Sequence, residues 1–253
     1  NCHMFTQSRF CTFTQSRFES RFCTFVNLGL NLGFVRSLNL GLNLGFVRSL
    51  NLGLNLVIFS ISRIHYSGGG DWYSDPSSIP NLLKYLKENT LIETNLIENE
   101  VKIGDDQFYL SSYLYLTGHG NIKLSNEEIA ILRHHLLNGA FLHADDNYGM
   151  DNSFRKLALE LFPDKELINL PHTHELFHCY YHFDNGLPKI HEHDKKPPQA
   201  LAIFHKEKII LLYTYESDLG DGWENQQVHN VSEIKRLEAL KMGTNIIVHA
   251  LSK

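Results

Sequence analysis

The residues best suited to chemistry are a pair of adjacent carboxylates at the end of an apolar run. The stretch FLHADDNYGMD, residues 141–151, passes through Asp145 and Asp146 into a Gly-containing loop. A carboxylate placed there can bind a metal ion, or act as a general base once its neighbours tune its pKa. If the strand continues through both residues, they point to opposite sides, so only one faces a shared pocket. The alternative is structural, with one of them capping the following turn or pairing with Arg155.

Histidines form the second chemical feature of the chain. Of the 15 histidines, 14 follow residue 56, and 6 lie between residues 172 and 193. Imidazole combined with carboxylate suits zinc, iron or manganese, so His119, His174, an Asp and one of His191 or His193 could hold a divalent metal. No recognised ligand spacing such as H-E-x-x-H is present. The alternative is histidines that lie on the surface or are hydrogen-bonded in the core.

Both tryptophans lie in segments rich in glycine and aspartate. Trp72 follows Asp71 in GGGDW, and Trp223 lies in ESDLGDGWE together with Glu216 and Asp218. An aromatic face beside carboxylates commonly holds sugars and other polar rings. The alternative for the tryptophans is a hydrophobic lid over the end of the sheet. The alternative for the glycines is a turn that needs their backbone freedom, and since no G-x-G-x-x-G or P-loop pattern is present, they are only a weak signal for phosphate binding.

Strand-like and helix-like segments alternate from residue 57 onward and must position these residues. Strands are expected at 57–66, 111–118, 140–144, 166–170, 201–205 and 209–215, and helices at 77–90, 125–139, 151–162 and 231–251. A capping box of Ser125 and Glu128 opens the second helix, and the turn KEK joins the last two strands as a hairpin. In the final helix Gly243 is a weak point. The alternation predicts one α/β domain, residues 57–253, with a mainly parallel sheet covered on both faces.

Each polar cluster directly follows one of the predicted strands. In such sheets the ligand crevice lies beyond the carboxyl ends of the strands, so SGGGDWY, TGHGN, DDNYGMD, PHTHELFH and ESDLGDGWE would gather at one edge if the strands are parallel. The last cluster could also bind calcium through Asp218, Asp221 and Glu224, although it lacks the EF-hand spacing. The expected site comprises Asp71, Trp72, Asp145, Asn147, Tyr148, His174, Glu216, Asp218 and Trp223 as ligand-binding residues, Asp146 and His119 as catalytic residues, and His174, His191 and His193 as metal ligands.

Three functions are compatible with this edge. The leading hypothesis is a pocket for a small polar, carbohydrate-like ligand. The second is a metal-dependent hydrolase, in which a His/Asp-bound ion lowers the pKa of water. The third is an assembly module without catalysis, in which the carboxylates are structural.

The chain resembles the domain-of-unknown-function family 4159, a branch of the class I glutamine amidotransferase-like superfamily. Five blocks in order, over about residues 60–250, carry the resemblance: GGGDWYSDPSSIPNLL, YLYLTGHGNIKLSNEE, LNGAFLHADDNYGMD, LPKIHEHD and LLYTYESDLGDGWE. The resemblance implies a flavodoxin-like three-layer α/β fold and little about activity. Amidotransferases of this fold carry a cysteine nucleophile on the turn after a central strand and a later His-x-Glu pair.

Neither amidotransferase feature is found at the corresponding positions. The equivalent turn, residues 144–147, has no cysteine, and HEHD at 191–194 contains no His-x-Glu. Cys179 lies in FHCYYHF, away from the turn, and we expect a buried or partly buried thiol there. Thioester chemistry at the turn is therefore excluded, which argues against glutaminase activity.

The composition of the chain limits the classes of partner that it can have. Residues 57–253 hold 18 basic and 27 acidic residues, which argues against a nucleic-acid partner. No apolar run approaches the roughly 18–20 residues needed to span a bilayer. Only Cys179 lies outside the first 23 residues, so the body of the chain has no internal disulfide framework and the redox compartment stays open. The oligomeric state is equally open.

Residues 1–56 are a low-complexity repeat tail. NLGLNLGFVRSL at 27–38 recurs unchanged at 39–50, and a third copy begins at 51. Solenoid repeats usually diverge in sequence and run to about 20 residues or more, so we predict a poorly ordered tail or a translated DNA repeat. VIFSIS at 57–62 reads either as the end of an export signal or as the first strand. On that ground we expect export to a bacterial periplasm, with the cytoplasm as the alternative.

Overall fold

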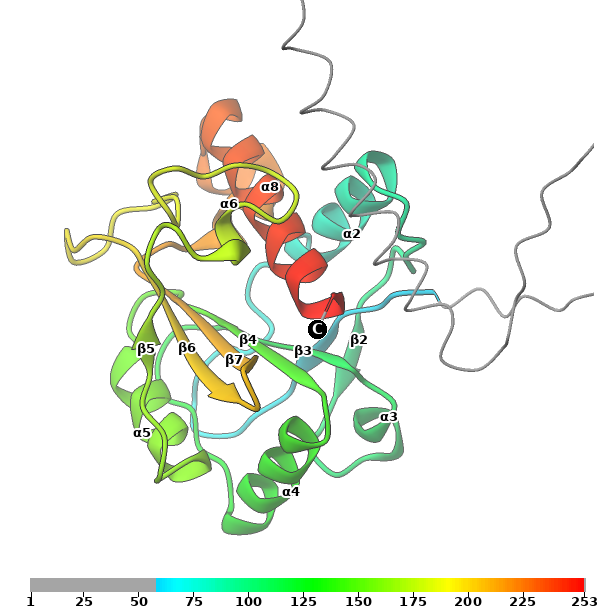
Figure 1. Ribbon diagram of the computed structural model, residues 1–253, viewed down its shortest axis with the longest axis vertical. Helices are drawn as coiled ribbons and strands as arrows, with labels where there is room; N and C mark the ends of the chain where they lie inside the picture. Colours follow the sequence, from blue (N-terminus) through cyan, green and yellow to red (C-terminus); the bar gives the residue numbers. More distant parts are fainter. Residues whose placement is uncertain (1–57, 253) are drawn as a thin grey trace, which may run out of the picture. The chain divides into compact units, whose positions relative to one another are not determined.

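Seven strands form one sheet in the computed structural model, which describes residues 58–252. Their order across the sheet is β2-β1-β3-β4-β7-β6-β5 (Figure 1). The strands are β1 (Ser62–Ile64), β2 (Asn99–Val101), β3 (Tyr113–Leu116), β4 (Phe141–Asp145), β5 (Ile168–Asn169), β6 (Gln199–His205) and β7 (Lys208–Tyr215). The predicted tail, residues 1–56, lies outside the described residues.

The sheet is mostly parallel, as the alternation of elements predicted. Neighbouring strands from β2 to β7 run parallel, whereas β6 is antiparallel to both β7 and β5. The predicted hairpin joins β6 to β7 through Lys206 and Glu207, whose φ angles of 49° and 65° suit a tight two-residue turn. The short edge strand β2 was not predicted, because it spans three residues of which only Val101 is buried.

Helices cover both faces of the sheet and make three layers (Figure 1). They are α2 (Ser78–Asn89), α3 (Asp106–Tyr109), α4 (Asn126–Leu137), α5 (Asp151–Leu161), the 3-10 helix η1 (Glu175–Phe177), α6 (Leu219–Trp223), α7 (Gln226–His229) and α8 (Glu233–Leu251). One face carries α4 and α5, and the other carries α2, α6 and α8. The capping box at Ser125 and Glu128 is confirmed, with each side chain accepting the other's backbone N–H.

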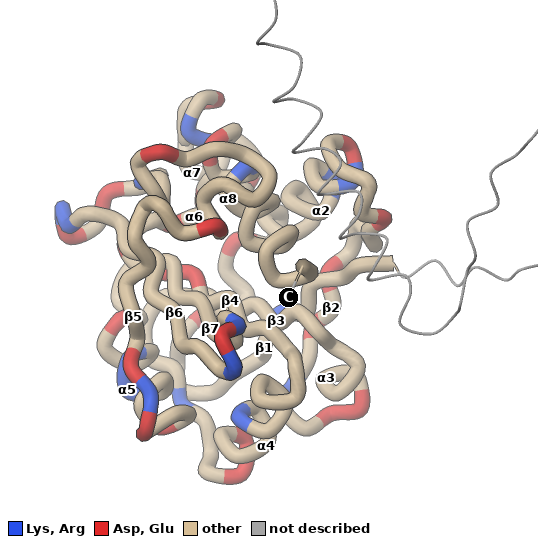
Figure 2. Tube along the Cα trace, viewed as in Figure 1, with Lys and Arg blue, Asp and Glu red and all other residues tan. Residues whose placement is uncertain are grey.

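Two observations bear on partners. Among the described residues, no helix has both the length and the apolar character that crossing a bilayer requires. Acidic and basic residues are scattered over several elements along the trace (Figure 2).

The two faces of the central strands differ in chemistry. Alternate residues of a strand point to opposite faces, and on the α4/α5 side these are apolar: Leu114, Leu116, Leu142 and Ala144. On the α6/α8 side the same strands present Tyr113, Tyr115, His143 and Asp145, all buried. The polar face is therefore enclosed beneath helices, and the residues on it must find hydrogen-bond partners there.

Trp223 closes this polar face and brings α8 close to it. Its ring centroid lies 5.7 Å from that of Tyr115 and its indole N–H donates to the carbonyl of Ala239. A Cβ atom at Gly243 would lie 2.7 Å from Leu82 Cδ1 and 2.9 Å from Trp223 Cζ2. The predicted weak point in the helix is thus a position of close approach, where glycine lets α8 pack against Trp223 and α2.

Candidate metal centre

The site forms where the segments that follow β4 and β7 emerge side by side. These strands are adjacent and parallel, so residues 146–150 and 216–224 leave the sheet at one edge. Residues 188–194 run against the second segment, because Ile190 N donates to Ser217 O at 2.9 Å. The edge therefore collects polar residues from three stretches that are distant in sequence.

Three carboxylate residues at this edge have a left-handed backbone. The φ angles are 55° at Asp75, 56° at Glu216 and 59° at Asp218. This conformation costs a residue with a side chain about 1–2 kcal/mol, and such strained positions cluster at functional sites. Here they turn Asp75 and Asp218 inward, to exposures of 7% and 2%. Glu216 is held by Lys189, whose Nζ lies 2.5 Å from Glu216 Oε2.

The first group of possible metal ligands is His191, His193 and Asp218. Asp218 Oδ2 lies 2.8 Å from His193 Nε2 and 3.6 Å from His191 Nδ1. Among the described residues, Asp218 Oδ1 is buried and accepts from no N–H group. The His191 side chain is 52% exposed, so the group opens to solvent on that side. Tyr148 supports the His193 ring, with centroids 5.3 Å apart.

The second group is Asp75, Asp221 and His229. His229 Nε2 lies 3.2 Å from Asp221 Oδ1 and 3.3 Å from Asp75 Oδ1. The two groups adjoin, because Asp221 Oδ2 lies 2.8 Å from His191 Nδ1. In both groups the carboxylates are buried, and the histidines range from 10% to 52% side-chain exposure. Six potential ligands therefore lie next to one another at this edge.

Arg63 holds the segment that carries Asp75. The guanidinium donates to the carbonyl oxygens of Ser74 at 2.8 Å and Asp75 at 3.3 Å, and it pairs with Glu98 at 2.8 Å. Arg63 is 1% exposed, so its charge depends on these partners. Asn147 adds a donor from the β4 side, with Nδ2 at 2.6 Å from Asp75 Oδ2. The orientation of Asp75 is therefore set from two sides.

Burial and mutual repulsion shape the protonation of these carboxylates. Burial, followed by the charge of Asp218, raises the pKa of Asp221 to about 7. Burial alone would raise the pKa of Asp218 too, but hydrogen bonds from His191 and His193 outweigh it and lower that pKa. In return, the hydrogen bond to Asp218 raises the pKa of His191 to about 9. The cluster thus holds protons in the metal-free protein, and a bound cation would displace them.

β4 ends at Asp145, so the condition under which Asp145 and Asp146 were predicted to face opposite sides, a strand running through both, is not met; the two carboxylates nevertheless have different hydrogen-bond partners. Asp145 Oδ2 accepts from Gly220 N at 2.6 Å on the α6 side, and its other oxygen accepts from the Thr214 hydroxyl. Asp146 Oδ2 accepts from Glu216 N at 3.1 Å, and the Asp146 Oδ1 atom, also buried, has no partner in the described chain. Arg155 pairs with neither of them. It forms an ion pair with Asp151 at 2.7 Å.

Two other predicted site residues, Asp71 and His119, contact each other. His119 Nδ1 lies 3.1 Å from Asp71 Oδ2, and the His119 backbone N–H also donates to the Asp71 carboxylate. Both side chains are partly exposed, at 53% and 35%. Trp72 stacks on His65 with ring centroids 4.2 Å apart. The structure thus joins the segments after β1 and β3 through this pair.

The remaining predicted residues lie elsewhere. His174 packs near His249 and Phe204, with ring centroids 5.6 Å and 6.3 Å away, and it belongs to neither ligand group. Trp223 is 1% exposed, so it has no face free for stacking a ligand. Cys179 is partly buried, as predicted, with Sγ 3.3 Å from Asn245 O.

Sequence reasoning missed Asp75 and His229 and considered Asp221 only as a calcium ligand. Asp75 follows GGGDWYS closely and was within reach of the rule that polar residues gather after strands. His229 gives no such signal, because it lies beyond the last predicted cluster and is brought back by α7.

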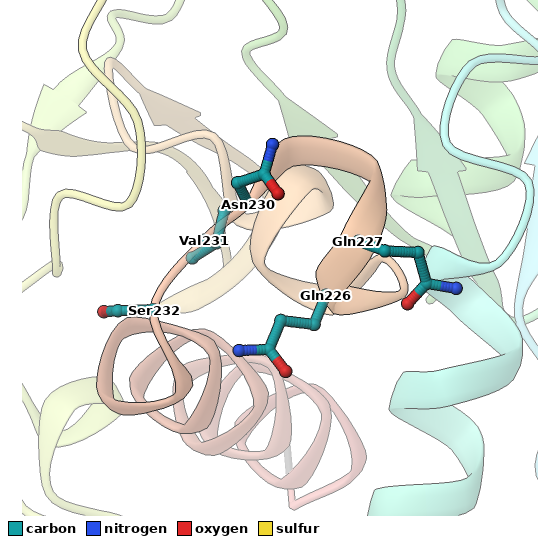
Figure 3. A pocket seen from close by; sticks show the side chains of 5 residues that line it. All are labelled: Gln226, Gln227, Asn230, Val231 and Ser232. Atoms are coloured by element: carbon teal, nitrogen blue, oxygen red, sulfur yellow. The ribbon is translucent and has the colours of Figure 1, made fainter.

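A shallow pocket lies beside the same short helix but has different chemistry. Its volume is about 290 Å³, and its lining consists of Gln226, Gln227, Asn230, Val231 and Ser232 (Figure 3). The lining offers amides and a hydroxyl, without a carboxylate or histidine. The chemistry at this edge therefore belongs to the His/Asp groups rather than to this pocket.

A single family match covers the whole of this edge. The family model described as "Domain of unknown function (DUF4159)" matches residues 60–251, which include every described strand and helix. The predicted family is thereby confirmed. No curated protein matches the chain.

Proposed function

The chain belongs to the DUF4159 family, and because that description assigns no activity, we propose from the site itself that this protein is a metal-dependent hydrolase. In this proposal His191, His193 and Asp218 bind a divalent ion, and the substrate is small and polar. The domain, residues 57–253, would be of the flavodoxin-like, class I amidotransferase-like kind, whose ligands bind beyond the carboxyl ends of the strands.

The convergence of two imidazoles on one buried carboxylate carries the proposal. Zinc bonds of about 2.0–2.1 Å in a tetrahedral site separate neighbouring ligand atoms by roughly 3.3 Å. The contacts of Asp218 Oδ2 with His193 and His191, at 2.8 Å and 3.6 Å, bracket that separation. The second oxygen of Asp218 is buried and accepts from no N–H group of the described residues, and the Asp218 side chain shares a further hydrogen bond only with another carboxyl group, that of Asp221. Burying an unsatisfied carboxylate oxygen is costly, and a cation would offset that cost.

The exposure of His191 supports catalysis rather than a closed structural site. Three protein ligands leave a fourth position for water, and this arrangement is typical of catalytic zinc. A bound ion supplies chemistry by lowering the pKa of that water toward neutrality. Zinc, iron and manganese all suit a ligand set of two imidazoles and one carboxylate.

A second candidate function is binding of a carbohydrate-like ligand without catalysis. The exposed Asp71–His119 pair favours it, because a carboxylate accepts hydrogen bonds from sugar hydroxyls. Trp72 lies next to Asp71 and offers an aromatic surface. Thermal-shift screening of sugars against the protein and an Asp71→Ala variant tests this candidate, and equal shifts in both would exclude the pair.

Metal binding by the full-length chain tests the leading proposal. We would purify the protein without chelators, measure its metal content, and titrate the metal-free form with Zn²⁺ and Mn²⁺. The variants are Asp218→Asn and His193→Gln, and the matched controls are His182→Gln and Asp184→Asn, which alter exposed residues.

The expected result is stoichiometric metal in the wild type and both controls. Loss of a residue that only hydrogen-bonds to a metal ligand weakens metal affinity about 10–100-fold, so loss of a ligand itself should weaken it by about 100-fold or more. A folded wild type without affinity for these ions would contradict the proposal. So would unchanged affinity in Asp218→Asn.

A further inference from the structure

The group Asp75, Asp221 and His229 has no role in the function proposed above, yet it repeats its chemistry. We propose that the edge is a two-metal centre, in which these three residues hold a second divalent ion and Asp221 bridges both ions. The inference rests on the proposed function for its first ion. It adds a second site, a bridging ligand and a class of substrate.

The position of Asp221 carries the inference. One carboxylate oxygen, Oδ2, lies 2.8 Å from His191 in the first group, and the other, Oδ1, lies 3.2 Å from His229 in the second. Each oxygen of Asp221 therefore faces a different ligand group. A carboxylate that binds one ion through each oxygen can hold two metals about 3.5–4 Å apart, the separation found in two-metal hydrolytic sites.

The second group is also oriented in advance. Asp75 Oδ2 accepts from Asn147 Nδ2 at 2.6 Å, which leaves Oδ1 directed to His229 at 3.3 Å. Hydrogen bonds of this kind to ligating carboxylates orient metal ligands. The other side-chain atom of Asn147, Oδ1, is buried and without a partner among the described residues. An ion at Asp75 would thus lie near a residue, Asn147, whose buried side-chain oxygen has no hydrogen-bond donor among the described residues.

The arrangement of charge favours ions over a purely structural network. Asp75, Asp218 and Asp221 are exposed by 7%, 2% and 5%, whereas His191 and His229, with side-chain exposures of 52% and 28%, lie on the side of the solvent. Burying several carboxylates beside one another is costly unless cations compensate them. Two divalent ions would compensate these three carboxylates together with the nearby charges of Glu224 and Asp146.

The pair of ions indicates the substrate. Two divalent ions held side by side, in a centre open at His191, would bind an oxyanion that spans both of them. Two-metal sites of this kind stabilise the attacking and the leaving oxygen in the hydrolysis of phosphate esters. We therefore assign a phosphate ester as the class of substrate, and inorganic phosphate is the matching probe.

Metal stoichiometry separates this inference from the proposed function. The full-length protein, freed of metal, is titrated with Mn²⁺, and bound metal and electron paramagnetic resonance spectra are recorded. We expect two ions per chain with the spectrum of a spin-coupled pair in the wild type and in the His182→Gln control. The deciding variant is His229→Gln, since its side chain is 28% exposed and its replacement leaves the core intact.

In His229→Gln we expect one ion per chain and the spectrum of an isolated ion. Asp75→Asn should do the same, provided that circular dichroism shows it folded. A wild type that saturates at one ion, unchanged in His229→Gln, overturns the second site and leaves the first ion in place. A wild type that binds no ion overturns both proposals.

Phosphate binding tests the substrate class. With saturating Mn²⁺, inorganic phosphate should raise the melting temperature of the wild type and shift that of His229→Gln much less, because only one ion remains to hold it. Equal shifts in the two proteins, or none in the wild type, would contradict an oxyanion bound across both ions.

Discussion

Replacing His143 with glutamine should remove a defined part of the acid sensitivity of this protein. His143 is fully buried on the polar face of β4, between the hydroxyls of Tyr113 at 3.2 Å and Thr214 at 3.1 Å. Burial lowers the pKa of His143 to about 3, because the imidazolium would lie out of reach of water. In the unfolded chain the same group titrates near 6.5.

The sign and size of the effect follow from these two pKa values. Between pH 6.5 and 3 the unfolded chain binds a proton at His143 that the folded protein excludes, so acid favours unfolding in this window. One pKa unit corresponds to about 1.4 kcal/mol. Lowering the pH from 7 to 5 should therefore cost the wild type about 2 kcal/mol at this residue, and His143→Gln should be spared that loss.

Urea denaturation at several pH values measures the difference. The free energy of unfolding of the wild type and of His143→Gln is compared from pH 8 to pH 4 in the presence of a chelator, so that titrating groups distant from His143 cancel in the comparison. His182→Gln, which alters an exposed histidine, should follow the wild type. If the wild type and His143→Gln lose stability in parallel, His143 is not a buried neutral histidine and the reasoning fails.

Three further outcomes are expected. Burial, and after it the charge of Asp218, raises the pKa of Asp145 to about 8, so the protonated carboxyl stabilises the folded protein at low pH and this stabilisation is lost between about pH 4 and 8. In denaturation series on metal-free protein, Asp145→Asn should lack this loss, and an unchanged dependence of the unfolding free energy on pH would refute the prediction. Gly243→Ala should destabilise the protein by about 1–3 kcal/mol, because its Cβ would overlap Leu82 and Trp223; a melting temperature equal to that of the wild type would contradict this close packing. Ser125→Ala should cost about 1 kcal/mol through loss of the capping box, and chemical denaturation would reveal it; no loss would mean that the cap contributes nothing.

Local structural features could be predicted from the sequence, because residues close together in the chain determine them. The capping box at Ser125 and the hairpin turn at Lys206 depend on contacts within a few residues. Alternation of strands and helices likewise predicted a mostly parallel sheet, since parallel neighbours need a crossover between them. The edge strand β2 was missed, because three residues carry too little periodicity.

The site could be predicted from the sequence only in part. The rule that ligands bind beyond strand ends led to Asp218, and the density of histidines led to one of His191 or His193 as a possible metal ligand. Nothing in the sequence joined these histidines to Asp218, because that contact depends on how residues 188–194 pack against the turn at Ser217. His229 returns to the edge through α7, and a tertiary path of that kind leaves no local pattern.

From the sequence alone, Asp145 and Asp146 were expected to point to opposite sides if a strand ran through both, because the side-chain period of a strand is two, but β4 ends at Asp145. Only the tertiary structure decided what each of them meets. Helix α6 packs on one face and gives Asp145 the backbone N–H of Gly220, whereas Asp146 meets that of Glu216. The strand specifies the direction of a side chain, but its partners are brought by segments that are distant in the chain.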